Sequence, residues 1–133
     1  MNKIACITGA SSGIGRATAE SLAKEGFRLI LCGRRKERLE ELKASLKVDS
    51  TILVFDVTDQ KSVITAFESL TSDWRNIDIL VNNAGNAHGM SAIQDGDVAD
   101  WEAMMSSNVT GLLYVSKEVI KGMVERQSGH IIN

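Results

Sequence analysis

The feature that most constrains the fold of this chain is a regular alternation of short apolar runs with amphipathic stretches. Apolar runs begin near residues 3, 27, 51, 77 and 130, and each contains Ile, Leu or Val. Most of the stretches between them repeat apolar residues at helical spacing. This alternation is typical of a parallel sheet with helices on both faces. We therefore predict an α/β fold built on a doubly wound parallel sheet.

The pattern also places the individual elements. It predicts strands at residues 3–8, 27–32, 51–55, 77–81 and 130–133, and helices at residues 15–25, 35–46, 59–72 and from 97 to about 123. Right-handed crossovers give the strand order 3-2-1-4-5. We expect Gly26 to end the first helix, and Asp59 and Asp97 to cap later ones. The long last helix is expected to bend at Gly111 or Gly122.

The balance of charges and the cysteine usage exclude several classes of ligand. Because 15 Lys and Arg face 17 Asp and Glu, the net charge of −2 gives no basic field that would attract nucleic acid or a membrane surface. No apolar stretch approaches the roughly 20 residues of a membrane span. Cys6 and Cys32 lie inside the first two apolar runs, where we expect reduced core side chains, and no His and Cys spacing suits a metal. We therefore expect a cytoplasmic protein of one domain, residues 1–133, that binds a small molecule.

A glycine-rich turn, TGASSGIG at Thr8–Gly15, joins the first strand to its helix. Glycines let the backbone turn tightly and let a pyrophosphate approach the N–H groups at a helix N-terminus. The spacing G-x-x-x-G-x-G differs from the dinucleotide fingerprint G-x-G-x-x-G. Taken alone, the turn is either a phosphate-binding loop or a tight strand-to-helix connection.

Two motifs in this sequence resemble the signatures of one family. TGASSGIG matches the glycine motif TGxxxGIG of short-chain dehydrogenases/reductases, and NNAG at Asn82–Gly85, at the end of the fourth predicted strand, matches the second signature. Both stand where that family places them, and the resemblance covers essentially the whole chain. It implies a Rossmann-type, nicotinamide-dependent oxidoreductase.

The resemblance also implies which residues bind the cofactor. Its phosphates and the adjacent ribose would meet Gly9, Ser11, Ser12, Gly13, Ile14 and Gly15. The adenine would meet Asp56, with Val57 behind it, and the adenosine side and nicotinamide ribose would meet Asn83, Ala84 and Gly85. Asn82 is expected to tie neighbouring strands together instead.

The choice between NAD and NADP depends on the end of the second strand, which reads Gly33, Arg34, Arg35. A dinucleotide fold that selects NAD usually places Asp or Glu there to bind the ribose 2′-hydroxyl. A carboxylate would repel a 2′-phosphate, whereas a guanidinium pairs with it bidentately. We therefore predict NADP(H). In the alternative, both arginines are only solvated at a helix start, which is a poor place for cations without an anion.

Of the family's catalytic Asn, Ser, Tyr and Lys, only the Asn has a match, which is Asn108 within SSNVTG. In the family this Asn lies in the long helix and holds a water on the proton path, while the Lys lowers the pKa of the Tyr general acid or base. The Ser, Tyr and Lys are expected after Asn133. Tyr114 and Lys117 show a Y-x-x-K spacing but precede the fifth strand, so we expect Tyr114 to pack the helix or contact a subunit.

The resemblance implies that residues 1–133 are the N-terminal half of a domain of about 250 residues, truncated before the later strands. We expect the fifth strand to be an unprotected apolar edge. The helix face formed by Leu112, Val115, Val119 and Met123 is expected to lack neighbours. The chain alone should be inactive. The alternative is a dinucleotide-binding module without catalysis.

Several runs, among them GRRKERLEEL and WRNIDILVNNAG, resemble bacterial NADP-dependent 3-hydroxy acid dehydrogenases. This resemblance implies a hydroxyl or carbonyl substrate such as serine. It also implies a homo-oligomer, a dimer or tetramer, that pairs through the long helix when full length. The loop Asn86–Met90 either borders the substrate or is a mobile surface loop, and we assign no chemistry to His88.

Overall fold

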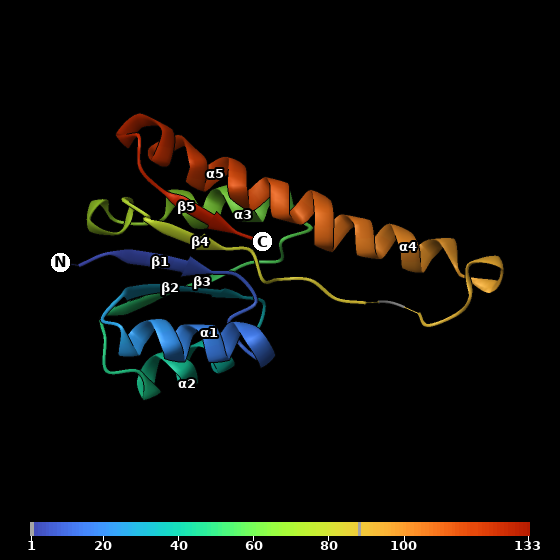
Figure 1. The fold of residues 1–133 in the computed structure, drawn as a ribbon, viewed down its shortest axis with the longest axis horizontal. Helices are drawn as coiled ribbons and strands as arrows, with labels where there is room; N and C mark the ends of the chain where they lie inside the picture. Colours follow the sequence, from blue (N-terminus) through green and yellow to red (C-terminus); the bar gives the residue numbers. More distant parts are fainter. Residues whose placement is uncertain (1, 88) are drawn as a thin grey trace.

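The computed structural model describes residues 2–87 and 89–133, and a five-stranded parallel sheet lies at its centre (Figure 1). The strands are β1 (Ile4–Ile7), β2 (Arg28–Gly33), β3 (Ser50–Val54), β4 (Ile79–Val81) and β5 (His130–Ile132). Their order across the sheet is β3-β2-β1-β4-β5, and every pair is parallel. The predicted α/β class and strand order are therefore confirmed.

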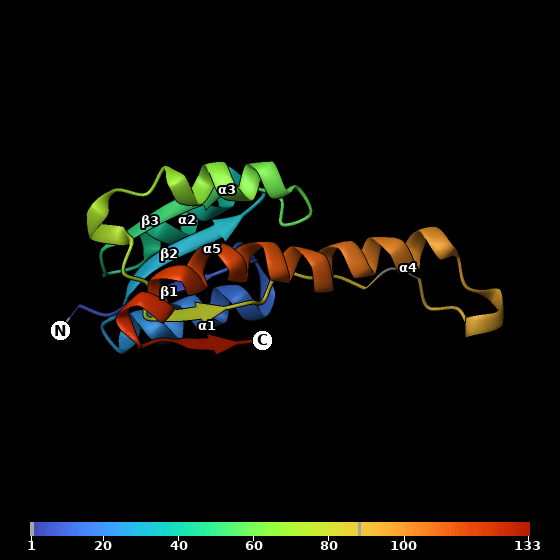
Figure 2. The same ribbon diagram turned by 90° about the horizontal axis from the view of Figure 1, so that it is seen from above.

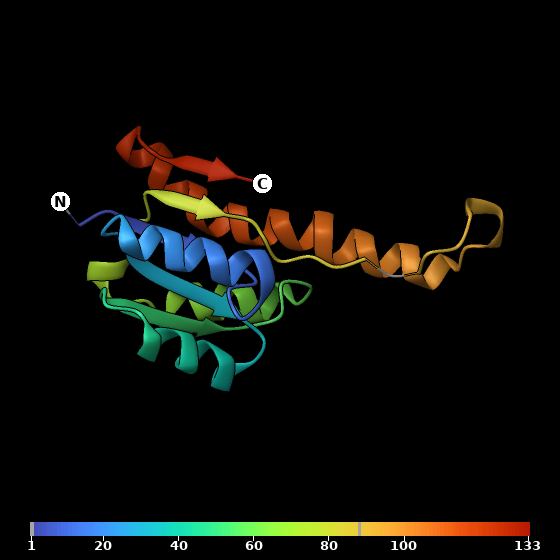
Figure 3. The same cartoon turned by 60° about the horizontal axis from the view of Figure 1, so that its bottom comes forward.

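Helices cover both faces of this sheet. They are α1 (Gly13–Lys24), α2 (Lys36–Ser45), α3 (Gln60–Glu68), α4 (Val98–Met105) and α5 (Gly111–Arg126), with 3-10 turns η1 (Ser72–Trp74) and η2 (Ile93–Asp95) and a π-helical segment η3 (Ser106–Thr110). Helices α1 and α2 lie on one face, and α3 and α5 lie on the other (Figures 1 and 3). The sheet is thus doubly wound, as a parallel sheet with two apolar faces requires.

Each face of the sheet has its own apolar core, because successive strand residues point to opposite faces. Ala5 and Ile7 of β1 pack with α1 and α2, whereas Ile4 and Cys6 pack with α3 and α5. Cys6 and Cys32 are free and fully buried, and their sulfurs lie 3.6 Å apart. Burial raises the pKa of the Cys32 thiol, so this side chain stays protonated. The predicted place of both cysteines in the core is confirmed.

Three predicted helix ends are found at the expected residues. Gly26 follows α1 with φ +85°, and the next amide, Phe27 N–H, donates to Leu22 O at 3.1 Å. Asp59 caps α3 and Asp97 caps α4, each through a side-chain oxygen that accepts a backbone N–H. Helix α3 ends at Glu68, before the expected residue 72, where the Ser69 hydroxyl donates to a backbone carbonyl of the last turn.

The long helix runs on through α4, η3 and α5, and its α4 end projects away from the sheet (Figure 2). Its irregularity is the π-helical turn at η3, which immediately precedes Gly111. A Cβ on Gly111 would lie 2.8 Å from Val57 Cγ2, so this glycine lets the helix approach the turn after β3. The need for a glycine here comes from close packing rather than from a bend at Gly111 itself.

The expectation that one face of α5 would lack neighbours is wrong. Val115, Val119 and Met123 are buried against α3 and the sheet within this chain. A different stripe is exposed, including Leu113 and Val124. Among the described residues β5 pairs with β4 alone and is largely exposed, so it is the expected sheet edge. Within residues 2–87 and 89–133, no helix has the length and apolarity needed to cross a bilayer.

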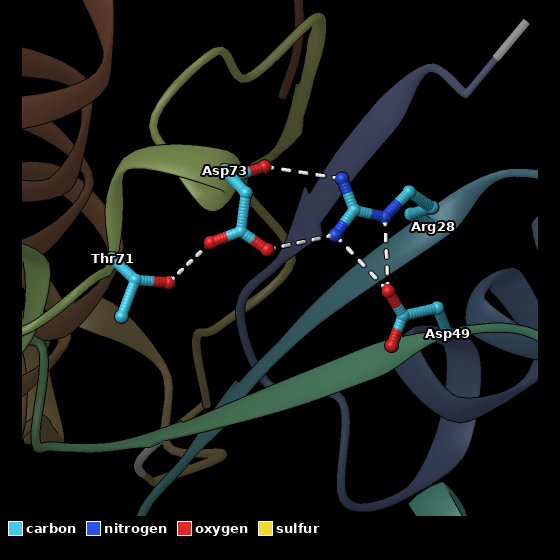
Figure 4. Close-up of polar contacts among 4 residues, drawn as sticks. All are labelled: Arg28, Asp49, Thr71 and Asp73. Carbon is cyan, nitrogen blue, oxygen red and sulfur yellow. Dashed lines mark hydrogen bonds and ion pairs between the residues drawn. The ribbon is translucent and has the colours of Figure 1, made fainter.

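An arginine clamp joins three segments at the amino ends of the strands (Figure 4). The Arg28 guanidinium of β2 donates to Asp49 Oδ2 at 3.0 and 3.1 Å and to the Asp73 backbone oxygen at 3.0 Å. Its carbon lies 4.1 Å from the centre of the Trp74 ring. The clamp is at the edge of the sheet opposite to the carboxyl ends of the strands, so it stabilises the fold from the far side.

Candidate functional site

A cavity of about 740 Å³ lies at the carboxyl ends of the strands. Its walls are the β1–α1 turn, the end of β2, the β3–α3 turn, the loop after β4, and one side of the helix at residues 103–107. Ligands of doubly wound folds bind at this edge, where the strand order reverses, and the volume is in the range of a ligand site. The fold therefore provides one site for a large ligand.

Most of the residues predicted to bind a cofactor meet at this cavity. Those that line it are Gly9, Ser11, Ser12, Ile14, Arg34, Arg35, Asp56, Val57, Asn83, Ala84 and Gly85. Gly13 and Gly15 lie beside them in the first turn of α1. Asn108 is outside the lining set. The predicted residues thus come from four separate turns but converge on one site.

The glycines of the β1–α1 turn are required by its geometry. Gly9 has φ +62°, and a Cβ there would lie 2.9 Å from Asn83 Nδ2 and 3.0 Å from Ala84 Cα. Gly13 has φ +58° with open space around it, and a Cβ on Gly15 would overlap the Gly9 carbonyl. Only glycine adopts such a turn without strain. The turn therefore packs directly on the loop after β4 and leaves room beside Gly13.

The N-terminus of α1 faces the cavity with its amides open. The N-cap residue, Ser12, makes no side-chain cap bond, and the first turn holds no acidic residue. Asp59 and Asp97 fill the same position at α3 and α4. The first amides of a helix lack intrahelical acceptors and carry a partial positive charge. The arrangement therefore fits a phosphate group, which would take the place of the missing cap.

Three charged residues, Arg34, Arg35 and Asp56, stand at the other end of the cavity. Arg34 Nη1 lies 4.0 Å from Asp56 Oδ2, and both side chains are substantially exposed. Asp56 Oδ1 accepts from Thr58 N at 2.9 Å and from Thr58 Oγ1 at 2.7 Å. Because an exposed pair at this distance contributes little, the guanidinium is available to another anion. Arg35 is the N-cap of α2 and makes no side-chain cap bond.

Two threonines that the sequence reasoning did not select hold the predicted residues in place. Thr8 is 2% exposed, and its Oγ1 accepts from Asn83 N at 3.0 Å and from Ala84 N at 2.9 Å. Thr58 fixes Asp56 as described above. Each threonine has a signal in the sequence that could have identified it. Thr8 is the polar residue directly after a buried strand, and Thr58 is two residues after an Asp in a turn, where an Asp side chain often accepts a hydrogen bond. Both threonines also line the cavity themselves, beside the residues that they hold in place.

Asn82 and Asn83 have distinct partners. Asn82 Nδ2 donates to Ser116 Oγ and to Asn133 Oδ1, both at 3.0 Å, which joins β4 to α5 and to the end of β5 as expected. Asn83 Nδ2 donates to the carbonyls of Thr8 and Gly9 at 3.2 and 3.1 Å. Asn83 therefore braces the glycine turn from the side of the β4 loop.

Asn108 lies in the π-helical segment and faces the loop after β4. Its Nδ2 donates to Asn86 O at 2.8 Å, and its Oδ1 accepts from Asn86 N at 2.9 Å. A Cβ on Gly85 would lie 2.6 Å from Asn108 Oδ1, so the loop rests directly on this amide. A catalytic role for Asn108 stays a prediction. Tyr114 packs on the core beside α3, which agrees with a helix-packing role.

Asn86, at the start of the predicted substrate-bordering loop, lines the cavity, whereas Met90 is fully exposed. His88 lies outside the described residues. The loop thus meets the site at its first residue.

A doubly wound parallel sheet with an open glycine turn at its switch point defines a dinucleotide-binding α/β fold of the Rossmann type. The family model for short chain dehydrogenases matches residues 3–133. The chain therefore belongs to the short-chain dehydrogenase family.

Three relatives show which members of the family this chain is similar to. It is 44% identical over 130 residues to the NADP-dependent 3-hydroxy acid dehydrogenase YdfG of Escherichia coli K12, covering 98% of this chain and 52% of that protein. It is 44% identical over 127 residues to serine 3-dehydrogenase of Rhizobium radiobacter, covering 96% of this chain and 51% of that protein. A solved closed form of serine dehydrogenase complexed with NADP+ superposes with a TM-score of 0.93 at 44% identity, over 98% of this chain and 52% of that one. The chain spans about half the length of the curated relatives it matches.

Proposed function

We propose that this chain carries the cofactor site of an NADP(H)-dependent oxidoreductase that acts on a small hydroxyl or carbonyl compound. The observation that carries the proposal is the pairing of an open α1 N-terminus with Arg34 in one cavity. A 3-hydroxy acid such as serine is the best candidate substrate, since relatives with these names are 44% identical to the chain.

The cavity suits NADP(H) better than NAD(H) for an electrostatic reason. A pyrophosphate fits the uncapped amides of α1, and the 2′-phosphate fits the guanidinium of Arg34, with Arg35 beside it at the start of α2. The carboxylate that pairs with Arg34 is that of Asp56, which lies in the turn after β3 and not at the end of β2. The position that an acidic residue would occupy in an NAD-selective site is thus held by a cation.

In the proposed reaction the chain's own residues bind and orient. NADP(H), when bound, supplies or accepts the hydride. The turn Thr8–Gly15 holds the phosphates, and Thr8 and Asn83 keep the loop after β4 in contact with this turn. Asn108 holds that loop from the opposite side. We propose that the proton-transferring Ser, Tyr and Lys follow Asn133, so that residues 1–133 alone would bind cofactor without turning substrate over.

The same proposal includes the wider organisation of the protein. Residues 1–133 would be the N-terminal half of one domain of about 250 residues. The exposed apolar side chains on α4, η3 and α5 suit a helix-to-helix interface with a second copy in a dimer or tetramer. These are Met105, Val109, Leu113, Ile120 and Val124. The two free cysteines favour a cytoplasmic location.

A non-catalytic dinucleotide-binding module is the second candidate. The observation that favours it is Asn108, the one matched catalytic residue, whose amide is engaged by the backbone of Asn86. The sequence of the gene beyond Asn133 separates the two. A Ser followed about a dozen residues later by Y-x-x-x-K supports the enzyme, and a stop codon supports the module.

Cofactor preference tests the main proposal. Titration of the natural protein with NADPH and with NADH should show tighter binding of NADPH, and Arg34→Asp should reverse the preference. A hydrogen-bonded charge pair contributes about 1.5–3 kcal/mol, so the loss for NADPH should be roughly 10- to 100-fold.

Arg38→Asp is the matched control for this titration. It makes the same change of charge on the exposed surface of α2, four residues further along the chain, and does not line the cavity. Its effect on the ratio of the two affinities should be small. If Arg34→Asp left that ratio unchanged, or if Arg38→Asp changed it as much, the assignment of Arg34 to a 2′-phosphate would be wrong.

A further inference from the structure

The loop after β4 is held against the π-helical segment by a polar cluster of Asn86, Ser107 and Asn108. Asn108 uses both ends of its amide on the Asn86 backbone, at 2.8 and 2.9 Å. Because a backbone N–H only donates and a carbonyl only accepts, this pair fixes which way the Asn108 amide points. Asn108 therefore holds the backbone of Asn86 in a defined position.

Ser107 contacts the side chain of the same residue. Its Oγ lies 2.9 Å from Asn86 Oδ1, and 3.1 Å from both Asn108 Oδ1 and Ala103 O. Ser107 is 7% exposed and is one of only three polar residues buried among those that the structure describes. A buried hydroxyl is costly unless it is hydrogen-bonded. Ser107 has a single proton to donate, and of the three oxygens that can accept it, Asn86 Oδ1 is the nearest. Ser107 and Asn86 both line the cavity.

The loop between these contacts is supported at both of its ends. Thr8 binds the amides of Asn83 and Ala84 at the first end, and the Asn86 cluster holds the second. Gly85, between them, lies directly on Asn108. A change at the second end therefore moves the part of the cavity wall formed by Ala84 and Gly85.

We propose that Ser107 is a positioning residue, which acts through Asn86 to place Ala84 and Gly85 where they meet the nicotinamide ribose. The inference rests on the proposed function. A misplacement of 1 Å in a reacting complex costs on the order of 10²-fold in rate. Removal of the Ser107 hydroxyl leaves the two hydrogen bonds between Asn108 and the Asn86 backbone in place, so its effect should equal that of one net hydrogen bond, about fivefold in kcat.

Hydrogen exchange in the ligand-free natural protein tests the positioning directly, with Ser107→Ala as the variant. The amides of residues 83–86 should exchange about fivefold faster, because one of the contacts that holds the loop is gone. Ser45→Ala is the matched control. Its Oγ also donates to a backbone carbonyl of its own helix, Leu42 O at 2.7 Å, and it does not line the cavity. It should leave exchange at residues 83–86 unchanged.

Kinetics then test whether the positioning matters for the reaction, with L-serine and NADP+ as probes. Ser107→Ala should lower kcat about fivefold and change the KM for serine little. Asn86→Ala removes the side chain but keeps the backbone contacts to Asn108, so it should lower kcat equally. If Ser107 acts through Asn86, the double variant should be no worse than either single one. Ser107→Cys leaves no cavity and keeps a weak hydrogen-bond donor, although its sulfur is larger than the oxygen. It should therefore show a smaller loss of kcat than Ser107→Ala, and it serves as the second variant if Ser107→Ala folds poorly.

Three results would overturn the inference. Losses in kcat that multiply to about 25-fold in the double variant would mean that the two residues act independently. If Ser107→Ala and Ser45→Ala gave the same hydrogen-exchange rates at residues 83–86 and the same kcat, Ser107 would have no positioning role. Failure of the wild-type protein to bind NADPH would overturn the proposed function and the inference together, whereas the first two results overturn the inference alone.

Discussion

Replacement of Gly9 by Ala tests the reasoning about the glycine turn, because three glycines of this chain separate backbone strain from steric overlap. Gly9, Gly13 and Gly26 all have positive φ, at +62°, +58° and +85°. A Cβ meets nothing within 4 Å at Gly13 and Gly26. At Gly9 it would lie 2.9 Å from Asn83 Nδ2 and 3.0 Å from Ala84 Cα, which is tighter than an ordinary contact.

The expected costs follow from these two terms. Alanine in the left-handed region costs about 1 kcal/mol, which all three variants share. Overpacking against backbone adds about 2 kcal/mol, and only Gly9→Ala carries it. We therefore expect Gly9→Ala to lower the free energy of unfolding by about 3 kcal/mol, and Gly13→Ala and Gly26→Ala by about 1 kcal/mol each.

Urea unfolding followed by circular dichroism measures these differences, and an NADPH titration of the same variants adds the functional readout. Gly9→Ala pushes on Asn83, which braces the turn, and Gly13→Ala fills space beside the open α1 amides, so both should weaken NADPH binding. Gly26→Ala lies at the other end of α1 and should leave binding intact. If Gly9→Ala proved no less stable than Gly26→Ala, the steric account of the turn would be refuted.

Three further predictions concern residues around this site and on the far side of the sheet. The Thr71 hydroxyl, together with the Arg28 guanidinium, lowers the pKa of Asp73, so the stability that this carboxylate adds is present at neutral pH and is lost as pH falls below its usual value of 3.8. Between about pH 6 and about pH 3, the wild type should therefore lose more stability in urea unfolding than Asp73→Asn, and equal losses would contradict the shift. Thr8→Val leaves two amides of the β4 loop without their acceptor and should cost about 2 kcal/mol, while Thr8→Ser keeps the oxygen and should cost clearly less. Cys6 and Cys32 should resist a thiol reagent in the native protein and react after unfolding, and rapid labelling of the native protein would contradict their burial.

The parts of the fold and site that the sequence predicted correctly all have a local signal. Gly26 ends α1 because the residue after a helix often adopts the left-handed conformation, which glycine tolerates. Asp59 and Asp97 cap their helices by accepting hydrogen bonds from backbone N–H groups no more than three residues further along the chain. Arg34 was found because the end of β2 must face the ligand edge of a parallel sheet. Each of these inferences needs only neighbours in the chain and the strand order.

The parts that the sequence did not reveal depend on contacts between distant segments. Thr8 holds Asn83 and Ala84 across 75 and 76 positions, and Asn86 meets Asn108 across 22. No periodicity or spacing encodes such pairs, because either partner alone is an ordinary polar residue. Local patterns therefore identify residues that face a ligand more readily than residues that hold them in place.

The error over α5 has a related physical cause. Helical spacing marks two apolar stripes on this helix, one with Val115 and Val119 and one with Leu113 and Val124, and the pattern gives no rank between them. The first stripe is covered because α3 follows β3 onto the same face of the sheet and packs beside it. That choice is made by the strand order, which sends α3 and α5 to one side and α1 and α2 to the other. The stripe left exposed is therefore the one turned away from the sheet, and it is there that a second copy or a further segment would find apolar surface to bury.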